Sequence, residues 1–385
     1  MNLQCLCLLA LCAIHSGCGS TDEKLEATYT KSVAWLWAQQ APDGGWHSET
    51  HTVLRDGVAL TPYILYYLLQ VPDSVFHRDD AAVKRGIEYI RSTAGSAFHG
   101  LNGSMTDYNY PNYSAAYALR VLHLTKQDTT LQDLLGQYLR RQQYIEQRGI
   151  FPKDLAYGGW GFGEPGIAIG KVGHVDLSHT RRVIEAMIEK ADAKAEVEVQ
   201  IIGVRQFLQG VQRDTDDPRL YDGCQSRKHQ PYDGGFVYSI VTLAANKSKP
   251  VQIEGAGIHY PSYATATCDG LLALYALGDT LTSSYRDARQ WLTLHQRIDV
   301  VEGLSPDDPG QWDEAMHYYH WSVRAEAMTK AGIEGPWRKE LKKALVREQK
   351  YNGFYLNPLG GINKENDPLM ATIFAIQAMT ALRVG

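Results

Sequence analysis

The residues best suited to chemistry are acids and histidines at short spacing. Asp176 precedes His179 by three positions, and His317 precedes His320 by three, which places these two histidines on one face of a helix. Carboxylate and imidazole groups so arranged can transfer protons or orient a ligand. Two histidines can also bind a metal, but no HExxH sequence accompanies this pair, so we predict no metal site. The alternative for each histidine is a hydrogen bond within the core.

An aromatic repeat indicates which elements position these residues. Residues 31–46 read KSVAWLWAQQAPDGGW, in which a Trp-Leu pair is followed by a Gln and then by Gly-Gly-Trp. Weaker copies begin at Tyr89, Tyr138, Phe207, Trp291 and Val346. The Gln is suited to pair backbone groups left open at a helix end, and the glycines allow a close turn that the aromatic ring covers. We therefore interpret the repeat as structural rather than catalytic.

A second helix is predicted after each copy of the repeat. These segments are rich in Ala, Leu and Met and span residues 62–71, 113–124, 177–190, 265–277, 317–330 and 368–382. They are more apolar than half-exposed helices, which indicates an inner layer enclosed by the amphipathic helices of the repeats. Six such pairs bury every inner helix if they close into a ring. The predicted fold is all-α, an (α/α)6 barrel formed by residues 28–385.

The mouth of this barrel is the predicted site. All inner helices of such a ring run in one direction, so their N-termini converge and their dipoles favour negative charge there. The same dipoles lower the pKa of an acid placed among them unless desolvation dominates. The catalytic candidates at the mouth are Asp176, His179, Asp269 and His320, and the ligand-binding candidates are Tyr63, Tyr66, Tyr113, Tyr263, His317 and Tyr319.

The N-terminus has the features of an export signal. Residues 3–14 are apolar apart from Gln4, and this segment is too short to span a bilayer but is typical of a signal-peptide core. The following residues, His-Ser-Gly-Cys, resemble a lipoprotein cleavage site that would leave Cys18 acylated. We expect a signal peptide over 1–18, a linker over 19–27 and attachment to the cell envelope by the lipid. Simple secretory cleavage near Gly19 is the alternative.

Composition excludes several classes of function. Lys and Arg number 38 against 43 Asp and Glu, and no basic run is present to bind nucleic acid phosphates. Neither GxxxxGK nor a GxGxxG that follows a strand occurs, so no cofactor is predicted. Outside the leader only Cys224 and Cys268 remain, and whether they form one disulfide is left open.

With these motifs, the sequence resembles the terpenoid cyclase and protein prenyltransferase superfamily, whose QW motifs are similar to KSVAWLWAQQAPDGGW. The stretches AYGGWGFGE, DLSHTRRVIEAM, YPSYATATCDGLLALYALG and HYYHWSVRAEAM most resemble a squalene-hopene cyclase-like, exported bacterial branch described as prenyltransferase and squalene oxidase repeat proteins. The resemblance implies an α-α toroid that binds an apolar or isoprenoid-like small molecule.

Cyclases of this superfamily protonate an alkene with the middle Asp of a DxDD motif that opens an inner helix. This chain has Asp214-Thr215-Asp216-Asp217, but Pro218 follows, which favours an extended backbone at the preceding residue. We therefore predict that these aspartates lie in a surface loop and that replacing them leaves any activity largely intact. The comparable inner-helix position holds a single acid, Asp176.

Protein prenyltransferases of the same superfamily bind zinc through an Asp, a Cys and a His. Tyr319-His320 matches the Tyr-His pair of that pattern, but Pro261 and Tyr263 stand where the Asp and Cys would align. Prenyl transfer to proteins is therefore not expected.

Three functions remain open from the sequence. The first is a toroid that binds an isoprenoid-like ligand, with or without cyclising or isomerising it. An acid in a closed apolar chamber would support this function. The second is a non-catalytic binding or scaffold protein of the envelope, for which the central cavity would be filled. The third is glycan chemistry, which (α/α)6 barrels also perform and which requires an open, polar, Tyr-lined groove.

Overall fold

The computed structural model describes residues 20–94, 101, 110–163, 166–308 and 310–383. The predicted signal peptide and Cys18 lie outside these residues. Within them the chain is almost wholly helical, with one small β-hairpin. Short 3-10 helices occupy connections at Thr52–Leu54, Glu146–Arg148, Lys194–Val197, Arg227–His229, Leu243–Ala245 and Gly361–Asn363.

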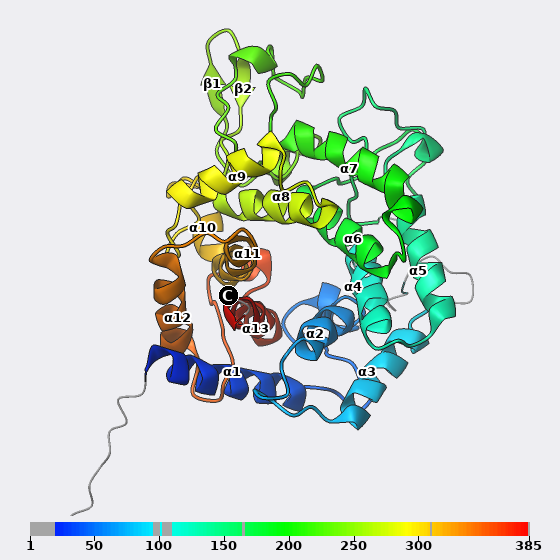
Figure 1. The fold of residues 1–385 in the computed structure, drawn as a ribbon, viewed down its shortest axis with the longest axis vertical. Helices are drawn as coiled ribbons and strands as arrows, with labels where there is room; N and C mark the ends of the chain where they lie inside the picture. Colours follow the sequence, from blue (N-terminus) through cyan, green and yellow to red (C-terminus); the bar gives the residue numbers. More distant parts are fainter. Residues whose placement is uncertain (1–19, 95–100, 102–109, 164–165, 309, 384–385) are drawn as a thin grey trace, which may run out of the picture.

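Among the described residues, six inner helices form a closed ring (Figure 1). They are α2 (Leu60–Leu69), α4 (Pro111–Leu124), α6 (Leu177–Lys190), α8 (Ala264–Leu277), α11 (His317–Lys330) and α13 (Pro368–Arg383). Each inner helix contacts the next, and α13 contacts α2, which closes the ring. Because their neighbours cover them on all sides, these helices are buried along most of their length.

Six outer helices surround this ring and alternate with the inner ones along the chain (Figure 1). They are α1 (Thr21–Ala38), α3 (Asp80–Ser92), α5 (Thr129–Gln142), α7 (Glu198–Val211), α9 (Ser283–Leu294) and α12 (Trp337–Glu348). A one-turn helix, α10 (Trp312–Ala315), precedes α11. The predicted all-α barrel of six helix pairs is thus confirmed.

The repeated Gln joins neighbouring helix pairs. The Gln40 side-chain amide donates to the carbonyls of Gly44 and Ala82, each at 2.9 Å, and so ties its own turn to the start of α3. Gln143, Gln212 and Gln349 make the same double contact with the glycine of their own turn and with α7, α9 and α1, respectively. These contacts give the repeat the structural role expected of it.

The repeat aromatics tie the turns to the inner ring. The backbone N–H of Trp46 donates to the Thr61 hydroxyl of α2 at 3.0 Å, and that of Trp160 donates to the Thr180 hydroxyl of α6 at 3.0 Å. Phe236 and Tyr355 bond Thr267 and Thr372 in the same way. Each turn therefore fixes where an inner helix begins.

Helix boundaries differ from the predicted ones in few places. The predicted segments 177–190 and 317–330 match α6 and α11, and the other inner helices differ by at most two residues at either end. The predicted linker 19–27 is wrong, because α1 already begins at Thr21. Ser20 and Glu23 form a capping box there and Leu25 is buried, so this segment packs as part of the barrel.

A long connection between α7 and α8 projects from the ring and carries β1 (Val251–Ile253) and β2 (Gly257–His259) (Figure 1). The strands pair antiparallel, with Val251 opposite His259. Cys224 of this connection and Cys268 of α8 are both buried and free, so they form no disulfide. Among the described residues, no helix combines the length and hydropathy needed to cross a bilayer.

The same connection holds Asp214, Asp216 and Asp217. The prediction of a surface loop is correct for Asp216 and wrong for Asp217. Asp216 is exposed, whereas Asp217 is only 2% exposed. The Asp217 carboxylate accepts hydrogen bonds from the Arg219 guanidinium at 2.8 and 2.7 Å. The ion pair with Arg219, two residues along the chain, therefore compensates the burial of this carboxylate. Pro218 indicated an extended backbone but gave no information about this pair.

Candidate functional site

A cavity of about 260 Å³ lies where the six inner helices begin, and we call it the mouth cavity. Each inner helix contributes residues from its first turns, among them Tyr63, Tyr113, His179, Ala266, Tyr319 and Met370. Connections between helices complete the wall with Leu54, Tyr110, Phe162, Tyr238, Lys247, Tyr263, Trp312 and Lys364. The inner-helix N-termini thus converge on one cavity, as expected.

The structure brings most of the predicted site residues together. Those that line the mouth cavity are Tyr63, Tyr113, His179, Tyr263, Asp269 and Tyr319. Asp176 lies directly behind His179 and is fully buried. These seven residues come from the N-terminal parts of α2, α4, α6, α8 and α11 and from the residues just before them.

Three predicted site residues lie elsewhere. Tyr66 packs beside the Arg120 guanidinium, 4.0 Å from its ring centroid. His317 Nε2 lies 2.8 Å from a Glu348 oxygen of the outer helix α12, and His320 Nε2 lies 3.4 Å from the Arg297 carbonyl. The spacing of His317 and His320 does place them on one face of α11, but that face is turned toward the outer layer.

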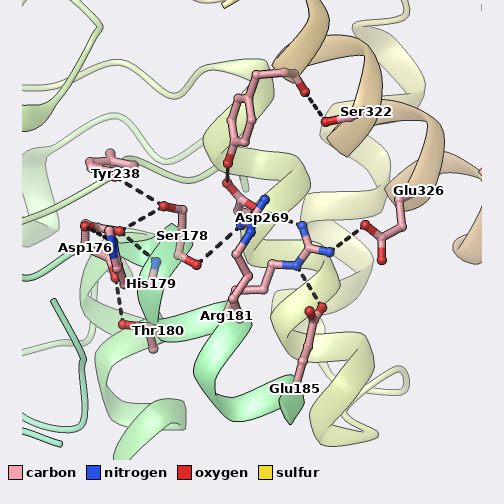
Figure 2. Close-up of polar contacts among 12 residues, drawn as sticks. Asp176, Ser178, His179, Thr180, Arg181, Glu185, Tyr238, Asp269, Ser322 and Glu326 are labelled. Carbon is pink, nitrogen blue, oxygen red and sulfur yellow. Dashed lines mark hydrogen bonds and ion pairs between the residues drawn. The ribbon is translucent and has the colours of Figure 1, made fainter. Parts of the chain in front are cut away.

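Asp176 and His179 form a buried hydrogen-bonded pair at the start of α6 (Figure 2). Asp176 is the N-cap: its Oδ1 accepts the His179 backbone N–H at 2.9 Å and the Ser178 hydroxyl at 3.1 Å. Its Oδ2 lies 2.7 Å from His179 Nδ1 and 2.7 Å from His174 Nε2. Burial alone would raise the pKa of the Asp176 carboxyl, but the imidazoles of His179 and His174 hold that pKa well below its usual value.

His179 presents one unused nitrogen. Burial lowers the pKa of His179 despite the opposing charge of Asp176, so at neutral pH the imidazole is neutral. Because its Nδ1 faces a carboxylate, Nδ1 carries the proton and Nε2 is an acceptor. Nε2 is buried and has no hydrogen-bond partner among the residues that the structure describes. Rings of Tyr113 and Phe162, with centroids 4.2 and 5.0 Å away, pack around the imidazole.

Buried ion pairs form the floor of the mouth cavity. Asp269 Oδ1 accepts from Arg181 at 3.0 Å and from Arg182 at 2.9 Å, and Oδ2 accepts the Tyr319 hydroxyl at 2.6 Å. Arg181 also donates to Glu185 at 2.8 Å and to Glu326 at 2.6 Å, as Figure 2 shows. We call these residues, Arg181, Arg182, Glu185, Asp269 and Glu326, the floor network.

Sequence reasoning did not find the two arginines of the floor network, although a signal was present. Adjacent arginines at 181 and 182 occur within a segment predicted to be an inner, apolar helix. Arginines are almost never fully buried unless they are paired, so a ring of inner helices required acids opposite them.

Two lysines from helix connections stand at the rim. Lys247 Nζ lies 3.9 Å from the Trp312 ring centroid and 5.0 Å from that of Tyr238, and Lys364 Nζ lies 5.3 Å from that of Tyr110. Among the described residues, neither ammonium group is within ion-pair distance of a carboxylate. Burial above all, and to a smaller extent the charge of Lys364, lower the pKa of Lys247 to about 8 against the opposing charges of Asp176 and Asp308.

The backbone at the rim is unusual. Tyr110 and Lys364 both have positive φ, 44° and 65°, which costs a residue with a side chain about 1–3 kcal/mol. Both side chains line the mouth cavity. No local sequence signal marks these positions or Lys247, because the side-chain directions of connections depend on what the connections pack against.

Comparison with known proteins supports the architecture. No protein-family model and no curated protein matches the sequence. Among solved structures, the Y157F variant of the type II terpene cyclase MstE from Scytonema matches with a TM-score of 0.58 at 10% identity, covering 95% of this chain and 99% of that one. This chain has the fold of the type II terpene cyclases.

Two further structures have the same fold. The D109N variant of MstE from Scytonema, solved with its substrate geranylgeranyl dihydroxybenzoate, has a TM-score of 0.57 at 10% identity, over 95% of this chain and 99% of that one. A protein from Actinoplanes has a TM-score of 0.53 at 13% identity, over 93% of this chain and 99% of that one. At such identities the likeness establishes the fold and assigns no role to individual residues.

Proposed function

We propose that this protein binds an apolar, isoprenoid-like small molecule in the mouth cavity. The observation that carries the proposal is the wall itself: aromatic rings and Met side chains surround a few polar groups, the pattern of a small-molecule site. The fold supports the choice of ligand class, because MstE, which shares it, has been solved with a geranylgeranyl substrate.

The charges in the cavity favour binding over acid-initiated cyclisation. Alkene protonation requires a carboxylic acid that holds its proton in an apolar chamber. The one carboxylate that lines the mouth cavity among the described residues is Asp269, and it is hydrogen-bonded by two guanidinium groups and a phenol. Asp176 lies behind His179 and is held ionised. The donors around Asp269 and the ionised state of Asp176 are the opposite of the apolar surroundings that alkene protonation requires.

The same geometry disfavours the other two functions considered. A scaffold would leave no lined cavity at the mouth, whereas here all six inner helices line one. Glycoside hydrolysis needs a pair of carboxyl groups that flank the substrate, whereas one carboxylate reaches the wall from the described residues. His179 Nε2 instead offers the ligand a hydrogen-bond acceptor.

The size of the cavity sets the length of the ligand. About 260 Å³ lies just below the range of about 300–1,000 Å³ typical of small-molecule sites. The floor network fills the centre of the barrel beneath the mouth cavity, so the ligand cannot extend further along the barrel axis. A cavity of that size suits a short isoprenoid rather than a triterpene.

We also propose that the protein is exported and held at the envelope by a lipid on Cys18. The apolar segment 3–14 and the His-Ser-Gly-Cys sequence support this proposal. Membrane attachment would place the mouth cavity close to a source of apolar ligands.

Native purification tests the proposed function. Protein purified from its own envelope should release, on solvent extraction, an isoprenoid-like compound detectable by mass spectrometry. Ala266→Phe places a ring in the mouth cavity and should abolish retention, whereas Ala193→Phe, at an exposed position, should not. The proposal fails if the wild type releases no such compound or if a folded Ala266→Phe variant retains the same amount.

A further inference from the structure

We propose that the ligand of the mouth cavity carries one anionic head group, a carboxylate or a phosphate, which Lys247 and Lys364 hold at the rim. This inference rests on the proposed function and deepens it by naming the chemistry of the ligand's polar end.

The charges of the cavity wall do not cancel. Among the described residues that line the mouth cavity, three are cationic, Arg182, Lys247 and Lys364, and one, Asp269, is anionic. Asp269 accepts a hydrogen bond from Arg182 at 2.9 Å and is shared with Arg181 of the floor. The two lysines are therefore left without an anion.

Lys247 keeps donor capacity for a ligand. Its ammonium group donates one hydrogen bond, to the Ala245 carbonyl at 2.6 Å, and otherwise faces the rings of Trp312 and Tyr238. An ammonium group has three donors, so two remain. Aromatic faces attract a cation but do not neutralise it.

The lysines are close enough to act on each other. The charge of Lys364 disfavours the charged form of Lys247, and the two acids that oppose this effect, Asp176 and Asp308, are not hydrogen-bonded to Lys247. Asp176 is already bonded by His174, Ser178 and His179. An anion between the ammonium groups would replace their repulsion by two attractive contacts.

Two buried polar atoms at the cavity have bonding capacity that no side chain of the described residues uses. The Tyr263 hydroxyl is one, in a residue 1% exposed: the Lys247 backbone N–H lies beside its oxygen, but its own proton has no acceptor among these residues. The other is Nε2 of His179, a residue 3% exposed. Native proteins rarely leave such atoms unpaired, and a phenol donates well to an anionic oxygen. The unused hydroxyl proton thus supports a head-group site beside Lys247.

Three ligands with one carbon chain test the inference by isothermal titration calorimetry at pH 7: geraniol, geranic acid and geranyl monophosphate. We expect at least one anion to bind about tenfold more tightly than geraniol, and the stronger of the two identifies carboxylate or phosphate as the head group. Raising the salt concentration should weaken binding of the anion and leave geraniol unaffected. The preference should also decline above about pH 8, where Lys247 loses its charge.

Variants locate the head group. The double variant Lys247→Met/Lys364→Met should lose the difference between anionic and neutral ligands. Lys249→Met/Lys350→Met removes the same number of charges from exposed positions and should keep that difference. If the double variant does not fold, the effect of salt on anion binding by the wild type tests the head-group site by itself.

The outcomes separate this inference from the proposed function. Equal affinity for geraniol and both anions overturns the head-group site and leaves the apolar site intact. A preference that survives both lysine substitutions, or that does not respond to salt, also overturns it. If none of the three compounds binds, the head-group site and the proposed function both fail.

Discussion

The floor and the rim of the mouth cavity surround their charged side chains with different partners. In the floor network each guanidinium lies against carboxylates, and Arg181 alone bonds Glu185, Asp269 and Glu326. At the rim, Lys247 and Lys364 lie against aromatic rings, and no carboxylate of the part of the chain that the structure describes pairs with them. Ion pairs that are complete within the chain hold helices together, whereas cations left open beside a cavity are available to a ligand.

This contrast has an energetic basis. A buried charge loses its hydration, and only close partners with good geometry offset that loss. The floor network meets this condition with contacts from α6, α8 and α11, so it links three inner helices. The rim lysines keep part of their hydration and gain from ring faces, which lets the protein tolerate them without a partner.

Breaking the floor network should have the largest effect. Arg181→Met leaves Glu185, Asp269 and Glu326 buried without their shared partner, so we expect the free energy of unfolding to fall by about 3–5 kcal/mol. Urea denaturation followed by circular dichroism measures this change. Arg205→Met breaks an ion pair to Asp279 in which the arginine is 47% exposed, and should cost at most about 1 kcal/mol. Equal losses in the two variants would contradict the assigned difference.

Acid pH should produce the next largest effect, through histidines packed away from the mouth. Burial, with the nearby charge of Arg324, lowers the pKa of His320 well below its usual value. Burial and the charge of Arg213 lower the pKa of His259 to about 4. The unfolded chain binds protons below about pH 6.5 that the folded chain does not, so stability falls as pH decreases from there.

The measurement is the free energy of unfolding at several pH values between 7 and 5. His320→Asn removes one such group and should flatten the decline by up to about 1.4 kcal/mol per pH unit. A slope identical to that of the wild type would show that His320 is protonated in the folded protein.

Removing a rim cation should have the smallest effect on stability. Lys247→Met removes a charge that burial disfavours, which is stabilising, and loses the ring contact, which is destabilising, so we expect the free energy of unfolding at pH 7 to fall by no more than about 1 kcal/mol. Between about pH 8 and 10.5 the unfolded wild type binds the Lys247 proton that the folded chain has released, so its stability should rise with pH there. The Lys247→Met variant should lack this rise. If it lost as much free energy of unfolding as Arg181→Met does, the distinction between floor and rim would be contradicted.

The fold was predictable because its signals are local. The Gln-aromatic repeat and the apolar segments after it predicted each inner helix to within two residues, and the ring then placed Asp176, His179, Tyr263 and Asp269 together. His317 and His320 were misplaced because a three-residue spacing defines a helix face but not its direction. On α11 the inward face carries Tyr319 and Glu326, which are seven residues apart. Tyr319 donates to Asp269 and Glu326 accepts from Arg181, so both contact the floor network.

What the sequence alone determined is the alternation of helices, their order around the ring and the end at which the inner-helix N-termini converge, since these follow from periodicity and repetition along the chain. The tertiary structure decided which groups meet there. Lys247 and Lys364 lie in different connections, more than a hundred residues apart, and they act on each other only because both connections pack over the same mouth. The burial of Asp217 and the direction of the α11 histidines were likewise set by packing partners, because a side chain's surroundings depend on residues distant in the sequence.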